Sequence, residues 1–200
     1  MNKVINSYGT DIESINDANG YLDQMFTRLI NEYNFPVDKA TIFYIFDRDV
    51  KSNTKTDVIE GLIYQLSNSR ENELYAKAGL LLLSYPSIES FITSNFKENS
   101  INLEFELGKE VKTYLHENQW SIQKINEGTL RLASKEMINS LSVIGIEDYD
   151  LDDFGKFNRL LFEYQEKYYM DNKKYRMLSL LCMAFIDLGL IEVEELEKLE

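Results

Sequence analysis

The hydrophobic and polar positions in the first half of the chain predict strands that alternate with helices. Thr41–Phe46 and Gly79–Leu83 contain no charged residue and favour strands buried on both faces, as in a parallel sheet. Val4–Tyr8 is a shorter strand-like segment. Each is followed by apolar residues at three- and four-residue steps, which are typical of an amphipathic helix. This order predicts a parallel sheet with right-handed crossovers.

The second half of the chain lacks strand-like segments and predicts helices. The helical patterns cover residues 104–116, 130–141, 151–169 and 175–188, with an acidic terminal helix or tail at 192–199. The pattern changes at Lys97–Asn102. We therefore expect an α/β fold class, in which residues 1–98 form a small parallel sheet flanked by helices. Residues 99–200 would form an α-helical C-terminal part packed on it.

The charge balance restricts the partners of the protein. The chain has 34 acidic and 21 basic residues, a net charge of −13, and both of its halves are acidic. Such a surface repels nucleic-acid phosphates at long range, so neither half is a nucleic-acid binder by electrostatics alone. We expect contact with nucleic acid only through a metal ion or a basic partner.

Membrane insertion and disulfide bonds are not expected. Apolar runs such as Ala78–Leu83 are far shorter than the roughly 20 residues that cross a bilayer. The N-terminus shows no basic and apolar leader. Cys182 is the only cysteine and His116 the only histidine, which excludes an internal disulfide and weakens any histidine-based site. We expect a cytoplasmic protein with Cys182 in the core and His116 on the surface.

Two aspartates directly follow the first long buried strand. Asp47 and Asp49 lie where that strand ends, and ligands of open α/β sheets bind beyond the carboxyl ends of the strands. Two carboxylates two residues apart can approach one hard cation, and Mg²⁺ is bound through one or two carboxylates, waters and substrate phosphate. A solvated loop that is acidic without binding a metal is an equal alternative, because aspartate is common in turns.

A further acid follows the second buried strand, in Ser84–Glu89. Parallel strands end at the same edge of a sheet, so Glu89 is expected near the two aspartates. It could act as a third carboxylate toward the same metal or substrate. Alternatively, Ser87 caps the next helix and Glu89 lies in its first turn, where the helix dipole favours an acid.

One basic cluster interrupts the acidic second half. It contains four cationic residues and three tyrosines: Lys167, Tyr168, Tyr169, Lys173, Lys174, Tyr175 and Arg176. Aromatic rings mixed with cations can bind single-stranded nucleic acid. The pattern favours the simpler interpretation, which is the tyrosine-rich surface of an amphipathic helix.

These motifs, taken in order, resemble those of toprim-type domains, the small parallel α/β sheets of topoisomerases, primases and phage-defence nucleases. The chain is more closely similar to a group of uncharacterised bacterial toprim-like proteins. They share the Ser-Tyr-Gly-Thr segment Ser7–Thr10, a strand that ends in Asp47-Arg48-Asp49, and the Ser-Tyr-Pro segment with its acid, Ser84–Glu89. Met177–Gly189 resembles the final helix of that group.

The resemblance implies a site for magnesium-dependent or manganese-dependent cleavage of phosphodiesters, as in a nuclease. Asp47, Asp49 and Glu89 would be the catalytic and metal-binding residues. The metal would neutralise charge on the scissile phosphate and activate water. Related toprim proteins act in defence against phage, often with an ATPase partner.

The chain departs from the toprim pattern at one position that matters for catalysis. Toprim enzymes carry a glutamate after their first strand as general acid or base, and here it has no counterpart, since Glu13 comes too late. Without it, metal binding should be weak and turnover slow or absent. The alternative function is a non-catalytic binding or regulatory module with a toprim-like fold, whose exposed sheet edge a protein partner could cover.

Overall fold

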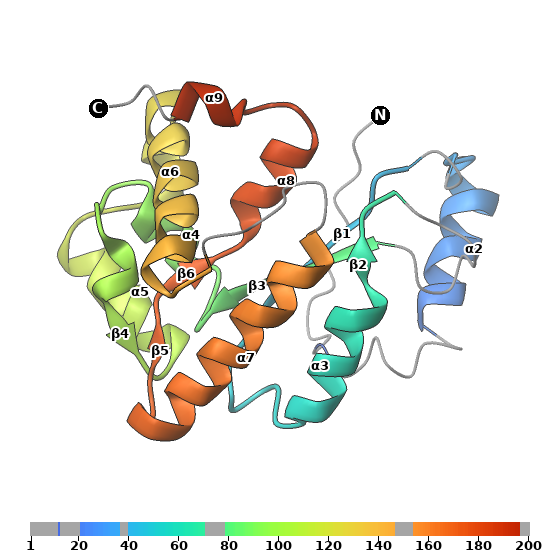
Figure 1. The fold of residues 1–200 in the computed structure, drawn as a ribbon. Coiled ribbons are helices and arrows are strands. Elements are labelled where there is room, and N and C mark those ends of the chain that lie inside the picture. The colour runs from blue at the N-terminus through green and yellow to red at the C-terminus, as the bar shows by residue number, and fades with distance from the viewer. Residues whose placement is uncertain (1–11, 13–20, 37–39, 71–78, 147–153, 197–200) are drawn as a thin grey trace.

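A computed structural model describes residues 12, 21–36, 40–70, 79–146 and 154–196 (Figure 1). Over these residues the strands are β1 Phe43–Asp47, β2 Ser67–Asn68, β3 Gly79–Tyr85, β4 Glu104–Phe105, β5 Tyr175–Arg176 and β6 Leu178–Ser179. The α-helices are α2 Tyr21–Tyr33, α3 Thr56–Gln65, α4 Glu89–Ser94, α5 Gly108–Glu117, α6 Glu127–Val143, α7 Phe154–Asn172, α8 Leu181–Asp187 and α9 Val193–Leu196. Two short 3₁₀ helices are η3 Ser100–Asn102 and η4 Ile122–Lys124.

The central sheet confirms the predicted α/β class. Strands β1 and β3 are parallel, in a register that runs from Phe43 opposite Leu80 to Asp47 opposite Ser84. The sheet order is β1-β3-β2, and β6 pairs with the end of β3. Because β2 and β6 run antiparallel to β3, the sheet is mixed and not wholly parallel as the sequence predicted.

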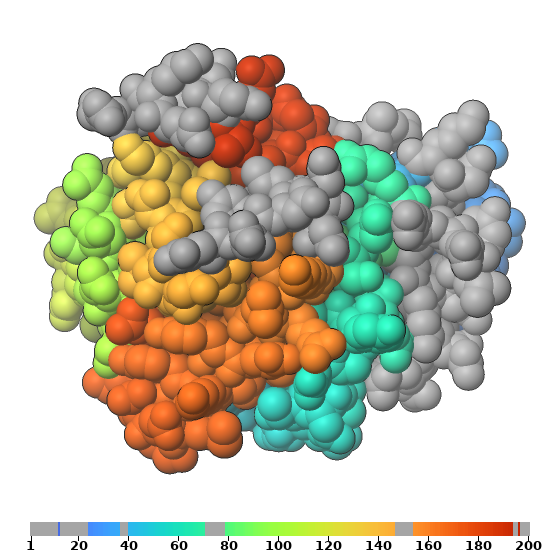
Figure 2. Space-filling model, in the orientation of Figure 1, coloured from blue at the N-terminus to red at the C-terminus, as the bar shows by residue number. Residues whose placement is uncertain are grey.

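Strand β3 is the centre of the hydrophobic core. All seven of its residues are buried, so helices must cover both of its faces. Helices α3 and α7 pack on each other and on β3, and they form adjoining parts of one surface in Figure 2. Helices α4, α6 and α8 form a second packed group around β3 and β6 (Figure 1). The carboxyl end of β3 is therefore held from several sides.

Strand β1 differs from its prediction. Its sequence suggested a strand buried on both faces, but only Tyr44 is fully buried and Ile45 is 44% exposed. The reason is its position, since β1 stands at one end of the sheet order formed by the described residues. The expected strand at Val4–Tyr8 lies outside those residues.

The C-terminal half contains strands that the helical prediction missed. Glu104–Phe105 forms β4 and pairs with β5, so the helix expected at 104–116 begins only at Gly108. The helix expected at 175–188 is replaced by β5, β6 and the shorter helix α8. These strands have two residues each, which is too short for a periodicity to reveal, and their partners are distant in sequence. The helices expected at 130–141 and 151–169 are present as α6 and α7.

Three smaller expectations can be compared with the structure. Cys182 is buried, and burial raises the pKa of its thiol to about 12, which keeps it protonated. His116 is exposed at the end of α5. Among the described helices, none combines the length and apolar character needed to cross a bilayer.

A buried ion pair connects the carboxyl end of β1 to α7. Arg48 is 2% exposed, and its Nε and Nη2 donate to the two oxygens of Glu166 at 2.7 and 2.8 Å. Its Nη1 donates to the carbonyl of Asn53 at 2.8 Å, and Nη2 also reaches Thr56 Oγ1 at 3.2 Å. The Tyr175 hydroxyl donates to Glu166 at 3.0 Å. These bonds fix the segment that carries both candidate aspartates.

We expect Arg48→Met to lower the free energy of unfolding by about 3–5 kcal/mol, because Glu166 would keep a buried charge without its partner. The double variant Arg48→Met with Glu166→Met should recover much of this loss, since no buried charge remains. Urea denaturation measures both. Equal stability of the single and double variants would contradict the assigned role of the pair.

Candidate functional site

The parallel pairing of β1 and β3 brings two of the predicted acids together. Asp47 is the last residue of β1 and lies opposite Ser84, and Glu89 is the first residue of α4, shortly after β3 ends. The backbone N–H of Ile88 donates to Asp47 Oδ1 at 2.7 Å. This bond holds the start of α4 against the end of β1, so the two carboxylates lie at one edge of the sheet.

The environment of Asp47 disfavours its negative charge. Burial raises the pKa of this carboxyl, and the charges of Glu89 and Asp49 raise it further. The hydrogen bond from Ile88 and the charge of Lys112 act in the opposite direction. The charges of Glu89 and Asp49 therefore add to the effect of burial on Asp47, which is a condition that a bound cation would relieve.

Glu89 is held by two neighbours. Ser87 Oγ donates to Glu89 Oε2 at 2.7 Å, so the serine orients the acid where the sequence suggested a helix cap. Lys112 Nζ on α5 lies 3.4 Å from Glu89 Oε1. The Lys112 side chain is 65% exposed, whereas that of Glu89 is 16% exposed, so the pair opens toward solvent on the lysine side.

Asp49 is turned toward its own loop. Its Oδ1 accepts a hydrogen bond from the backbone N–H of Lys51 at 2.9 Å, and its carbonyl accepts from Asn53 N at 2.8 Å. Asn53 in turn donates through Nδ2 to the carbonyl of Asp47 at 2.9 Å. The loop is thus ordered by its own polar groups, as the alternative of an acidic turn anticipated.

The donor set fits a magnesium site with two protein carboxylates. Over the described parts of the chain, no three His, Cys, Asp or Glu residues are placed to hold a metal ion together. Asp47 and Glu89 remain as two carboxylates at one edge of the sheet, and Mg²⁺ is commonly held by one or two carboxylates with water and phosphate oxygens. Asp49 lies near this pair and contributes charge.

Gly108 allows α5 to approach this edge closely. A Cβ at Gly108 would lie 2.7 Å from both Cβ and Oγ of Ser87, and 4.0 Å from Glu89 Oε2. Only a residue without a side chain lets the first turn of α5 pack here, and the same helix then delivers Lys112 to Glu89. The glycine therefore sets the distance between α5 and Ser87, which orients the acid.

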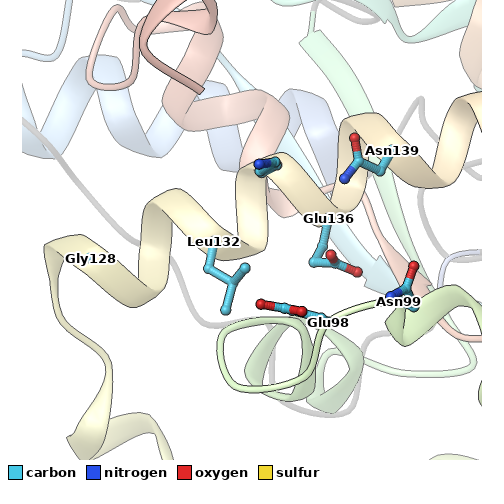
Figure 3. A pocket seen from close by; sticks show the side chains of 7 residues that line it. Glu98, Asn99, Gly128, Leu132, Glu136 and Asn139 are labelled. Carbon is cyan, nitrogen blue, oxygen red and sulfur yellow. The ribbon is translucent and has the colours of Figure 1, made fainter. Parts of the chain in front are cut away.

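A hollow in the surface lies elsewhere. It has a volume of about 460 Å³, between α6 and the loop after α4 (Figure 3). Its lining residues are Glu98, Asn99, Gly128, Leu132, Lys135, Glu136 and Asn139. Glu136 is 5% exposed and accepts a hydrogen bond from Ser100 N at 3.0 Å. None of the three predicted acids lines this hollow, so it is separate from the candidate site.

Comparison with known proteins does not assign the chain to a family. No protein family matches it, and no curated protein or solved structure is detectably similar to it. The resemblance to toprim-like proteins therefore remains a hypothesis that rests on the motifs and their order.

Sequence reasoning missed two residues that shape the site. Lys112 was one lysine among several on a predicted helix, and only the fold brings it to Glu89. Gly108 stood inside a segment predicted to be helical, where a glycine often has a packing reason. That glycine was a signal for close approach, although its partner Ser87 could not be identified from spacing.

We expect Gly108→Ala to destabilise the protein by about 1–3 kcal/mol, because the new methyl group would overlap Ser87. Gly61→Ala in α3 is the matched control, since nothing lies within 4 Å of its added Cβ. The control should stabilise by roughly 0.5–1 kcal/mol, because alanine favours a helix. Thermal unfolding of both variants measures the difference. Equal effects in both variants would argue against the close packing of α5.

The buried Glu136 predicts a pH dependence. Burial raises the pKa of this carboxyl, opposed by hydrogen bonds from the backbone of Ser100 and Asn99, and the charge of Glu98 raises it further. The folded state therefore binds the proton more tightly than the unfolded state, and this contribution to stability is lost as pH rises through the folded pKa. The melting temperature of Glu136→Gln minus that of wild type should be more positive at neutral pH than in acid. The opposite trend would contradict this account.

Proposed function

We propose that the protein is a divalent-metal-dependent, nuclease-type protein that acts on phosphodiesters at the carboxyl edge of β1 and β3. The observation that carries the proposal is the convergence of Asp47, at the end of β1, and Glu89, just after β3, where burial first and then the charge of Glu89 raise the pKa of Asp47. Such an arrangement is unfavourable in isolation and becomes favourable around Mg²⁺ or Mn²⁺.

The residues at this edge would have different roles in the reaction. Asp47 and Glu89 would hold the metal, which when bound neutralises charge on a phosphate and activates water. Ser87 orients Glu89 by its 2.7 Å hydrogen bond, and Lys112 offers an exposed cation beside the same carboxylate to a phosphate oxygen. Asp49 would contribute negative charge beside Asp47. A cytoplasmic role in phage defence with an ATPase partner belongs to this proposal through the toprim resemblance.

A second candidate is a non-catalytic binding module with the same fold. It is favoured by the bonds of the three acids, since Asp47, Asp49 and Glu89 each accept a hydrogen bond from the protein itself. In this case the edge would bind a ligand or protein partner without turnover.

We expect Mg²⁺ or Mn²⁺ to raise the melting temperature of the wild type, because a ligand that binds only the folded state stabilises it by mass action. Asp47→Asn and Glu89→Gln should abolish this rise, since each keeps the shape of the side chain and removes a charge from the metal site. Without metal, Asp47→Asn should be at least as stable as wild type, because repulsion between the carboxylates is relieved.

Glu117→Gln, at an exposed position at the end of α5, is the control and should respond to metal as the wild type does. An unchanged metal response in Asp47→Asn would exclude the proposed site. Hydrolysis of bis-p-nitrophenyl phosphate with Mn²⁺ then separates the two candidates. A metal response with hydrolysis that Asp47→Asn removes supports the nuclease-type function, and a metal response without hydrolysis supports the binding module.

A further inference from the structure

The second half of α7 carries a stack of aromatic rings that ends in a cation. The rings of Tyr164 and Tyr168 are parallel to within 18°, with centroids 6.1 Å apart. The guanidinium of Arg176 in β5 lies 5.1 Å from the centroid of the Tyr168 ring. The Tyr168 hydroxyl also donates to Glu104 in β4, which fixes the direction of that ring. The stack is therefore built from three elements and is held in place.

A second stack lies beside it and reaches the loop of the candidate site. Tyr169 stacks on Tyr175 with centroids 4.7 Å apart and an angle of 23° between the rings. Lys173 Nζ lies 5.8 Å from the Tyr169 centroid, and the Arg48 guanidinium lies 5.8 Å from the Tyr175 centroid. Because Arg48 stands between Asp47 and Asp49 in the sequence, this stack begins directly behind the candidate site.

We call this surface the tyrosine–lysine face; it comprises Tyr164, Lys167, Tyr168, Tyr169, Lys173 and Arg176. Its tyrosines are partly exposed and its two lysines are exposed. The second half of α7 reaches the lower part of the surface in Figure 2. This face concentrates three cations in a chain whose net charge is −13.

We infer that the tyrosine–lysine face binds single-stranded nucleic acid, with bases stacked on its rings and phosphates beside Lys167, Lys173 and Arg176. Parallel rings paired with cations match a polymer that alternates planar bases with anionic phosphates, and only unpaired bases expose their faces for stacking. The acidic remainder of the protein repels phosphates, which restricts the strand to this face. That the strand leads to the Asp47–Glu89 edge as substrate rests on the proposed function.

Binding can be tested with the full chain and fluorescently labelled oligothymidine and oligouridine of about twenty nucleotides, longer than common single-strand sites. Anisotropy in EDTA keeps the measurement independent of any metal site. Tyr164→Ala should weaken binding at least about tenfold, because base stacking is lost, and Tyr164→Phe should restore it. Lys167→Glu with Lys173→Glu should weaken binding and reduce the slope of log affinity against log salt by about 0.7 for each lost phosphate contact.

Lys97→Glu, at an exposed lysine beside the pocket residue Glu98, is the matched control and should bind as wild type does. A duplex of the same length should bind at least about tenfold more weakly than the single strand. The inference is overturned if neither oligonucleotide binds, if the duplex binds equally well, or if Tyr164→Ala and the lysine double variant bind like Lys97→Glu. Preference for one sugar identifies DNA or RNA as the strand.

These experiments distinguish a failure of the tyrosine–lysine face from a failure of the proposed function. Oligonucleotide binding in EDTA that Asp47→Asn leaves unchanged, without a metal response or diester hydrolysis, supports the face and excludes the metal-dependent function. Hydrolysis of the small diester without oligonucleotide binding supports the metal-dependent function and overturns the inference about the face.

Discussion

The ion pair between Arg48 and Glu166 is the interaction on which the arrangement of the carboxyl edge depends. A charge that is 2% exposed is tolerable only when its donors are satisfied, and here a carboxylate, a carbonyl and a hydroxyl accept from the guanidinium. Glu166 belongs to α7, so the pair fixes the distance between that helix and the end of β1. The edge with Asp47 and the face with Tyr164 and Lys167 consequently share one anchor.

The same pair explains why the two aspartates stay partly exposed although the arginine between them is buried. Alternate residues of an extended chain point to opposite sides, so the inward direction of Arg48 leaves its two neighbours directed away from the core. The backbone N–H of Arg48 donates to the carbonyl of Ser84 at 2.9 Å, so the hydrogen bonding between the two strands continues one residue beyond β1. The sequence analysis considered the two acids as a pair, but it did not assign a role to the arginine between them.

The sequence could predict the parallel pairing of β1 with β3 because both strands are long, apolar and followed by helices. It could also predict that Asp47 and Glu89 approach one another, because parallel strands end at the same edge. The two-residue strands β2, β4, β5 and β6 could not be predicted, since their pairing is decided by contacts distant in sequence. The hydrogen bond from Lys51 to the Asp49 side chain could not be predicted either. An aspartate that orders its own turn and an aspartate that binds a metal look the same in the sequence.

In the proposed function, Lys112 would decide how the edge responds to a cation. It is the protein's own counter-charge to Glu89, and a divalent ion would compete with it for the same carboxylate. The lysine side chain is 65% exposed at a separation of 3.4 Å, and exposed pairs contribute little to stability. Displacing it therefore costs little, and the freed ammonium stays tethered beside the edge, where it can pair with an incoming phosphate. The ion pair between Lys112 and Glu89 is thus compatible with the proposed function, in which a metal ion would replace the lysine beside Glu89 when an anionic ligand binds.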